Sequence, residues 1–388
     1  MAIFNSLGSN YNLSYVLKSL ATVGSASDKN KLTNLLEEKY GGKATLFYKG
    51  REALTATIKA LDLPEDAEIA INGFTCVAVF NAIRTAGAEP VCIDLEETGG
   101  LNFTPEGLLK SLRMNKKIKA VVVQNTLGYP CNIEEIQKIC KEHKLILIED
   151  LAHCIGAKYK NGKEAGTVGD FVVLSFSQDK IIDAVSGGAV VVRNIKYQIS
   201  NIKYQKNAGG LRERFYPSFT YKIREMYGVG LGKAYHFLLK KMGFLSNIMD
   251  ESLYEYYSLP SWNASLAVFQ FKTLSEQLSH RRKIASIYVE ELSDSMFMFD
   301  KQKTLEAVKL SSNLRFPIFV EQRSKLLKKL KEQGIYLEDI WYVDVAPECP
   351  NAVADSKIIV NLPTHINVRE KDAMRICTII NNFLSPRA

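Results

Sequence analysis

Four side chains that could share one chemical task lie at the ends of two apolar runs. The run LILIED (145–150) ends in Asp150, and His153 follows it closely. The run DFVVLSFS (170–177) contains Ser175 and leads into Lys180. In open α/β sheets, functional groups gather beyond the carboxyl ends of the strands. If the two runs are strands of one sheet, a carboxylate, an imidazole, a hydroxyl and an amine would meet there.

This combination is what a pyridoxal 5'-phosphate (PLP) site requires. A lysine forms an imine with the aldehyde of the cofactor and can then carry protons, while a carboxylate keeps the ring nitrogen protonated. Lys180 and Asp150 are our candidates for these two catalytic roles. His153 is the candidate for a hydrogen bond near the ring oxygen, which makes it the third catalytic candidate.

The phosphate of such a cofactor is held by backbone amides at a helix N-terminus and by a hydroxyl. Gly50 and Arg51 open the first helical stretch after an apolar run, and Ser175 supplies a hydroxyl. Each residue alone has an ordinary explanation. A lone Asp is usually a helix cap or a surface group, and most lysines are solvated. The four residues in this order and spacing favour the chemical explanation.

The surrounding pattern predicts the elements that would position these groups. Seven short runs rich in Val, Ile and Leu alternate with amphipathic helical stretches, and the runs do not alternate with polar residues, which is typical of strands buried on both faces. We therefore expect an α/β fold with a mostly parallel sheet. The runs are 45–48, 68–72, 90–95, 119–125, 145–150, 170–177 and 188–194, and the helical stretches are 51–61, 77–87, 104–114 and 133–144.

The pattern changes after residue 195. We expect a large α/β domain over residues 1–250, with a basic aromatic insertion over about 196–250, and a small C-terminal α/β domain over 251–388. The small domain would contain a long helix (262–293), a strand (314–320) and helices at 323–334 and 369–384. The segment 224–245 would form a helix pair that packs on the large domain, or one that makes a weak contact with a membrane surface.

Composition narrows the possible classes of function. The formal net charge of +8 over 388 residues suits an anionic small molecule, an acidic partner or a membrane surface, but no basic stripe indicates nucleic acid. The seven cysteines show no metal-binding or disulfide spacing, so we expect no metal site and a reducing, cytoplasmic environment. Neither a signal peptide nor a run of about 18 apolar residues is visible.

The stretch 148–194, together with YKGREAL (48–54), GFTCVAVFNAIRTAGAEPVCIDL (73–95) and NTLGYPCNIEEI (125–136), closely resembles the DegT/DnrJ/EryC1/StrS family of PLP-dependent sugar aminotransferases. The resemblance covers about residues 44–195 well and the C-terminal third loosely. It implies the fold of type I PLP enzymes and a homodimer with active sites at the subunit interface. It also implies that Lys180 holds the cofactor and that Asp150 partners the pyridine nitrogen. A lysine at position 180 favours transamination, because the dehydratase branch of the family has His there.

Some positions depart from the family pattern. Cys76 occupies the position of the aromatic residue that stacks on the cofactor ring, and Lys49 replaces a serine before the glycine. The family segment that reaches the phosphate of the neighbouring subunit is not visible, because Tyr256 and Ser258 lie at its aligned positions. Either another residue makes that contact, or the phosphate site is altered. Candidates for binding the donor carboxylate are His365 and the Arg and Lys residues of 202–224.

Three hypotheses of function follow. The first is an enzyme that moves an amino group from glutamate to a keto group of a nucleotide-linked sugar. The second is another reaction on the same PLP fold, such as that of a lyase or an amino-acid transferase. The third is a non-catalytic protein of this fold that acts as a regulator or binds a membrane surface. The intact set of Asp150, His153, Ser175 and Lys180 argues against the third.

Overall fold

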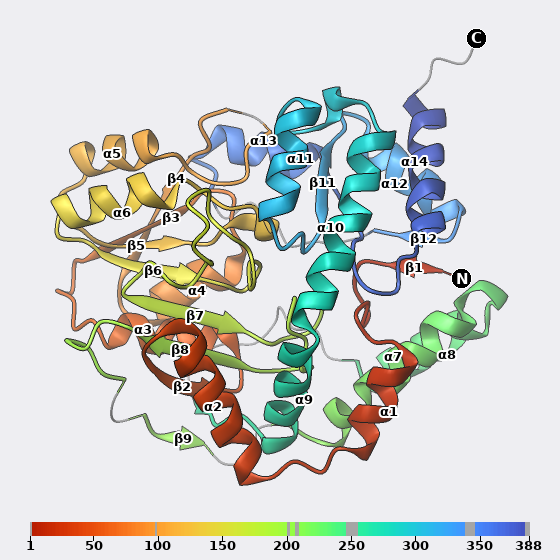
Figure 1. Ribbon diagram of the computed structural model, residues 1–388, viewed down its shortest axis with the longest axis horizontal. Coiled ribbons are helices and arrows are strands. Elements are labelled where there is room, and N and C mark those ends of the chain that lie inside the picture. Colours follow the sequence, from red (N-terminus) through yellow and green to blue (C-terminus); the bar gives the residue numbers. More distant parts are fainter. Residues whose placement is uncertain are drawn as a thin grey trace.

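A computed structural model describes residues 2–97, 99–199, 202–205, 209–245, 255–337 and 346–384. Its centre is a seven-stranded sheet with the order β2-β8-β7-β6-β5-β3-β4 (Figure 1). In this sheet β8 runs opposite to the other six strands, so the expected mostly parallel sheet is confirmed. Each predicted run corresponds to one strand: β2 Lys43–Phe47, β3 Glu68–Asn72, β4 Glu89–Ile93, β5 Ile118–Val123, β6 Ile146–Asp150, β7 Phe171–Ser175 and β8 Gly188–Val192.

Helices cover both faces of this sheet, which explains why its strands are continuously apolar. In β5, Ala120 and Val122 face one hydrophobic core, while Val121 and Val123 face another, and all four are buried. The first core is closed by α3 (Gly50–Lys59) and α4 (Val77–Thr85). The second is closed by α2 (Ala26–Tyr40), α5 (Pro105–Met114), α6 (Ile133–Glu142) and α9 (Ser261–Lys272).

A smaller unit with its own core lies beside the large sheet (Figure 1). The antiparallel pair of β11 (Phe316–Phe319) and β13 (Ile359–Leu362) lies at its centre. The N-terminal β1 (Ile3–Phe4) pairs with β12 (Ile335–Tyr336) and brings Ile3 into this core. The other elements of the unit are α10 (Leu274–Glu291), η3 (Asp294–Met296), α11 (Lys301–Leu310), α12 (Arg323–Glu332) and α14 (Glu370–Leu384). The helix α13 (Pro350–Ile358) instead packs beside the end of β4, in a cluster with Phe74 and Leu95.

The single helix expected over 262–293 is wrong, because α9 and α10 are separated at Thr273. The amide and the hydroxyl of Thr273 both donate to the carbonyl of Gln270, which closes a tight turn. The division of the chain at residue 250 stays a prediction. Residues of α9 belong to the core of the large sheet, while Ile3 belongs to the smaller core.

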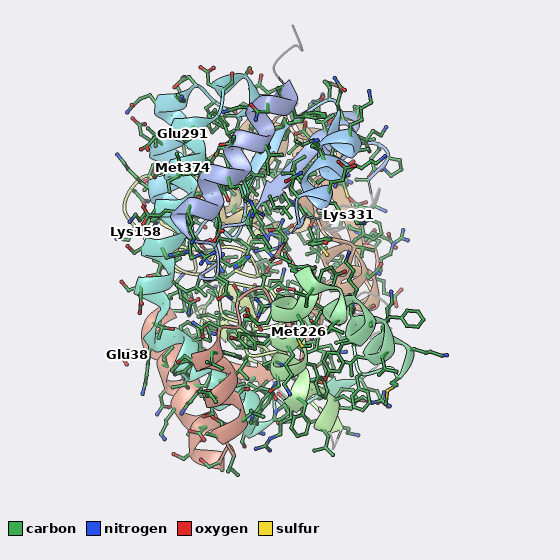
Figure 2. The ribbon with its side chains drawn as sticks, turned by 90° about the vertical axis from the view of Figure 1, so that its right-hand side faces the viewer. Glu38, Lys158, Met226, Glu291, Lys331 and Met374 are labelled. Carbon is green, nitrogen blue, oxygen red and sulfur yellow. The ribbon has the colours of Figure 1, made fainter. Side chains whose placement is uncertain are left out.

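The remaining helices lie along one side of the molecule. α7 (Leu211–Met226) packs against α1 (Leu13–Ala21), and after the short η2 (Tyr227–Val229) the chain continues as α8 (Leu231–Lys241). Figure 2 shows α7 and α8 on the same side as α12, with Met226 and Lys331 labelled. β9 (Tyr204–Gln205) and β10 (Tyr256–Tyr257) form a short parallel pair, and η1 covers Thr126–Gly128. Among the described residues, no helix is both long and apolar enough to cross a lipid bilayer.

Candidate active site

The carboxyl ends of β6 and β7 open into a cavity of about 710 Å³. All the residues that the sequence proposes for the cofactor line this one cavity, although they come from five separate segments of the chain. They are Gly50, Arg51, Cys76, Asp150, His153, Ser175 and Lys180. The expected gathering is therefore present in the structure, while the chemical role of each residue stays a prediction.

Asp150 and His153 are placed by the end of β6. Asp150 is only 4% exposed, and one carboxylate oxygen accepts a hydrogen bond from the amide of Ala152 at 2.9 Å. Burial raises the pKa of Asp150 to about 6, although the Ala152 amide and the charge of Lys180 oppose this rise. His153 Nδ1 accepts from the amide of Leu127 at 3.2 Å. Burial holds the pKa of His153 well below its usual range, which favours the neutral ring, and acceptance at Nδ1 leaves the proton of a neutral ring on Nε2.

Lys180 lies in the loop between β7 and β8, whose backbone is held firmly. Asp179 has a positive φ of 62°, which is uncommon for a residue other than glycine. Its amide donates to Asp183 at 2.7 Å, and the Asn10 side chain donates to the Lys180 carbonyl at 2.8 Å. The loop is thus fixed while the side chain of Lys180 lines the cavity. Burial lowers the pKa of Lys180, and the carboxylate of Asp150 counteracts this.

Residues near the N-terminus fix this loop, and sequence reasoning missed them. The amide and hydroxyl of Ser9 both donate to Asp179 at 2.9 Å, and the Tyr11 hydroxyl donates to Asp183 at 2.6 Å. These pairs are about 170 residues apart in the chain, so no local pattern could reveal them. Arg315, also missed, is fully buried, and its charge acts on both His153 and Lys180.

The N-terminus of α3 meets the end of β7 at the proposed phosphate cradle. A side chain at Gly50 would bring its Cβ within 2.8 Å of the Ser175 Cβ, so only glycine allows the helix to approach the strand this closely. Lys49 and Arg51 also line the cavity. Burial lowers the pKa of each, and the charge of Arg51 lowers that of Lys49 further. A bound anion would stabilise these two partly buried cations at the helix N-terminus.

Cys76 precedes α4 and lines the same cavity, half-buried. Its neighbour Thr75 donates to Gln124, which lies after β5 and also contributes to the cavity wall. A sulfur atom at this position can contact a flat ring by dispersion, but it lacks the stacking of an aromatic side chain.

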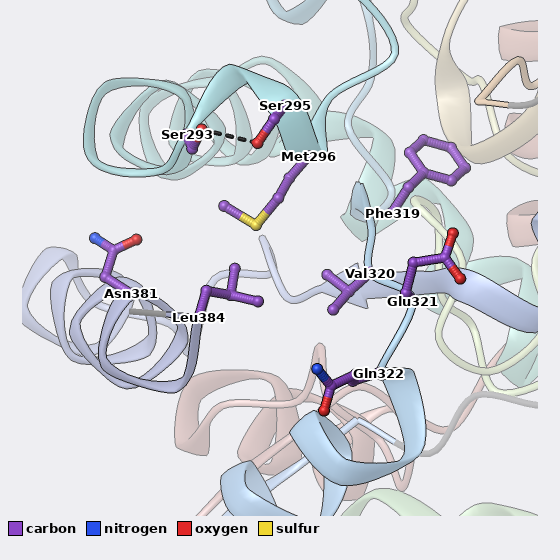
Figure 3. Close-up of a pocket in the computed structure, with 9 residues that line it drawn as sticks. All are labelled: Ser293, Ser295, Met296, Phe319, Val320, Glu321, Gln322, Asn381 and Leu384. Carbon is purple, nitrogen blue, oxygen red and sulfur yellow. Dashed lines mark hydrogen bonds between the residues drawn. The ribbon is translucent and has the colours of Figure 1, made fainter. Parts of the chain in front are cut away.

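The candidates for the donor carboxylate are less well placed. His365 is buried and bonds through Nε2 to the Phe4 carbonyl at 2.9 Å, and it does not line the cavity. Arg224 is also buried, with its guanidinium directed to the Tyr11 carbonyl. A separate cavity of about 540 Å³ lies in the smaller unit, between Met296, Val320 and Leu384 (Figure 3). It contains none of the residues that the sequence proposes for the cofactor.

These groups fit PLP at both of its ends. A buried carboxylate with a raised pKa would be stabilised by a cationic ring nitrogen. The cradle formed by Gly50 and Ser175, flanked by Lys49 and Arg51, would be stabilised by a phosphate. The sheet, the strand-end carboxylate and the lysine after β7 together define a PLP-dependent transferase of fold type I.

Comparison with known proteins gives the family. The model of the DegT/DnrJ/EryC1/StrS aminotransferase family matches residues 29–381, and the chain belongs to this family. The GDP-perosamine synthase of Vibrio cholerae is 27% identical over 355 residues, which are 88% of this chain and 86% of that protein. Helicobacter pylori PseC, an aminotransferase involved in the biosynthesis of pseudoaminic acid, has a TM-score of 0.73 at 21% identity, over 98% and 99% of the two chains. The PLP form of Spr1654 from Streptococcus pneumoniae has a TM-score of 0.66 at 17% identity, over 96% of each chain.

Proposed function

We propose that this protein transfers an amino group from glutamate to a keto group of a nucleotide-linked sugar, using PLP. The observation that carries the proposal is the shared cavity in which Lys180, Asp150 and the cradle of Gly50 and Ser175 lie together. Family membership supports the transfer of an amino group. The name of the Vibrio cholerae relative, GDP-perosamine synthase, supports a nucleotide-linked sugar as the acceptor.

When bound, PLP supplies the electron sink that stabilises negative charge on the substrate carbon. Asp150 would hold a proton on the ring nitrogen, and the Asp150 carboxylate would be stabilised in turn. Lys180 would hold the aldehyde and afterwards move a proton at the reacting carbon, and its lowered pKa makes the neutral amine more accessible. The amides of Gly50 and Arg51 with the Ser175 hydroxyl would bind the phosphate, and His153 would orient the ring oxygen.

The test separates the cofactor role from the choice of substrate. Borohydride reduction of the PLP-loaded protein should leave the mass of the cofactor on the peptide that contains Lys180. The Lys180→Ala variant should lose this adduct and slow the half-reaction with glutamate by about 10²–10⁴-fold. Lys163→Ala, at an exposed position, is the matched control and should behave as wild type. A full half-reaction in Lys180→Ala would refute the assignment.

The acceptor is tested separately with keto-sugars linked to UDP, GDP or dTDP after the half-reaction with glutamate. Formation of an amino-sugar nucleotide would support the proposal. If only keto acids accept the amine, the protein is an amino-acid transferase, which is the second hypothesis. Loss of carbon dioxide or water from the substrate instead of transfer of an amino group would indicate a lyase.

A homodimer in the cytoplasm is part of the same proposal. The dimer is what the resemblance to the family implies. The seven cysteines, which all lie in the described part of the chain, are free thiols there, which is compatible with a reducing compartment. Sedimentation equilibrium of the PLP-loaded protein checks the assembly. A monomer that is fully active would contradict the expected sharing of the active site between subunits.

A second candidate function concerns a membrane surface. The segment 224–245 contains α8, whose side chains Leu231, Phe237 and Leu238 are 60%, 70% and 51% exposed. Lys233 and Lys241 are exposed on the same helix. Apolar side chains flanked by lysines suit an anionic lipid surface. Co-sedimentation with phosphatidylserine vesicles, lost in Phe237→Ser but retained in Phe80→Ser, would support this contact.

A further inference from the structure

The cavity around Lys180 has a second end that is built from elements outside the central sheet. We call this end the distal subsite, and six residues define it: Phe4, Tyr227, His236, Lys240, Lys331 and Tyr336. They come from β1, from the segment η2–α8 and from the segment α12–β12. Figure 2 shows α8 and α12 on one side of the molecule, with Lys331 labelled between them. None of these residues takes part in the proposed chemistry, so the distal subsite needs its own explanation.

Three aromatic rings of the distal subsite form a packed unit. The rings of Phe4 and Tyr336 stack with centroids 4.7 Å apart and an interplanar angle of 12°. Tyr227 meets both rings edge to face, at 4.9 and 5.0 Å. Phe4 is buried, whereas both tyrosines are half-buried and line the cavity. Such a unit offers preoriented aromatic surface to a flat ring of a ligand, which is how proteins bind bases without reading their edges.

The charged side chains of the distal subsite are two lysines, Lys240 and Lys331, while burial and the charge of Lys240 lower the pKa of His236 and favour its neutral ring. His236 and Lys240 are four residues apart on α8, so they lie on the same face of the helix, and both reach the cavity. Lys331 of α12 reaches it from another side. Among the described residues that line the cavity, the carboxylates are Asp150 and Asp179, which both lie at the catalytic end. The distal subsite therefore attracts an anion with more than one negative charge.

We propose that the distal subsite binds the nucleoside diphosphate part of a sugar nucleotide, with the diphosphate near Lys240 and Lys331 and the base against Tyr227 and Tyr336. This inference rests on the proposed function and names the part of the chain that selects the substrate. An amino-acid carboxylate would need one cation and no flat ring. A sugar nucleotide uses both features, and it places its sugar between the distal subsite and Lys180, in one continuous cavity.

The experiment measures binding to the PLP-loaded protein by titration calorimetry. The probes are UDP, GDP, dTDP and inorganic pyrophosphate. Lys240→Ala and Lys331→Ala should each weaken the binding of the nucleoside diphosphate and of pyrophosphate by about 10-fold or more, since each removes a charged hydrogen-bond donor. Tyr227→Leu should weaken the binding of the nucleoside diphosphate by about 5-fold or more and leave the binding of pyrophosphate unchanged, because only the base would stack on this ring.

Lys241→Ala is the matched control, because this lysine is the exposed neighbour of Lys240 on α8 and does not line the cavity. It should bind every probe as wild type does. All variants should keep the rate and the KM of the half-reaction with glutamate, which also shows that they are folded.

Three results would overturn the inference. The first is that no nucleoside diphosphate binds to a protein that is active with glutamate. The second is that Lys240→Ala and Lys331→Ala bind the nucleoside diphosphates as wild type does. The third is that these two variants raise the KM for glutamate instead. The last result would assign the lysines to the donor carboxylate. In each case an intact half-reaction keeps the proposed PLP chemistry, so failure of the subsite is distinguishable from failure of the proposed function.

Discussion

The two ends of the cavity are built in different ways. At the catalytic end, Asp150 and Ser175 are the last residues of strands buried on both faces, and Lys180 follows in a loop held by Ser9, Asn10 and Asp183. At the distal end, the side chains come from two strands of two residues, from η2 and from the helices α8 and α12, all outside the central sheet. Chemistry needs groups fixed within a fraction of an ångström. Recognition of a large ligand tolerates less rigid elements, which can differ between proteins that share the same sheet.

Among variants that leave Lys180 in place, the largest effect is expected from Asp150→Asn, which removes a charged group from the catalytic end of the cavity. Loss of the charged partner of the ring nitrogen should slow the half-reaction with glutamate by about 10- to 100-fold. Binding of nucleoside diphosphates at the distal end should not change. Stopped-flow kinetics and calorimetry check both statements. A variant with the wild-type rate would remove Asp150 from the mechanism.

Although Asp150→Asn should slow the reaction, it should make the cofactor-free protein more stable. Burial raises the pKa of Asp150 to about 6, so the folded protein holds this proton more tightly than the unfolded chain does. Stability is therefore lost as the pH rises from about 4 to about 6, and Asn avoids this loss. At pH 8, cofactor-free Asp150→Asn should have a free energy of unfolding about 1–3 kcal/mol above wild type. Urea titrations at pH 8 and near pH 4, where the gain should vanish, measure this difference.

Gly50→Ala should weaken the binding of PLP and lower the stability of the fold. The new Cβ would lie 2.8 Å from the Ser175 Cβ, so the helix must move away from the strand. We expect a loss of about 1–3 kcal/mol in the free energy of unfolding, and PLP that is lost on dialysis. Gly228→Ala is the control, because no atom lies within 4 Å of its added Cβ. Equal retention of PLP by both variants would contradict the proposal that Gly50 and Ser175 form the phosphate cradle.

Asn10→Ala tests how the Lys180 loop is held. The Asn10 side chain donates to the Lys180 carbonyl and accepts from the buried Arg281 at 2.7 Å. Asn10 is a positioning residue, so its loss should slow the half-reaction about 10-fold at an unchanged KM for glutamate. It should also shift the pH at which the absorption of the bound cofactor changes. A lower melting temperature with normal kinetics would show a purely structural role.

The sequence correctly predicts that Asp150 and Lys180 lie in one cavity, because the signals for their positions are local. Apolar runs buried on both faces define the strands, and Asp150 and Lys180 follow from the positions where these runs end. The contacts of Ser9 and Tyr11 with the Lys180 loop join segments about 170 residues apart, and no periodicity reports such a pairing. At the break between α9 and α10, the amide and the hydroxyl of Thr273 both bond back to the Gln270 carbonyl, a local turn that the apolar pattern does not report.

The distal subsite is less predictable for the same reason. β1 and β12 are two residues each, too short for an alternating pattern, and they pair across more than 300 residues. The rings of Phe4 and Tyr336 stack only because that pairing brings them together, so neither residue stands out in the sequence. Residues 338–345, which follow β12, lie outside the described part of the chain.

The smallest expected effect is the dependence of the distal end on salt. Attraction between Lys240, Lys331 and a diphosphate should weaken as the Debye length shrinks from about 30 Å at 0.01 M salt to about 10 Å at 0.1 M. At saturating glutamate, the KM for the sugar nucleotide should rise about 2- to 5-fold over this range, with little change in kcat. The double variant Lys240→Ala/Lys331→Ala should start from a higher KM and respond less to salt. An equal response in both proteins would place the charges that attract the substrate elsewhere, for example on Lys49 and Arg51 of the catalytic end, and would remove the functional difference between the two ends of the cavity.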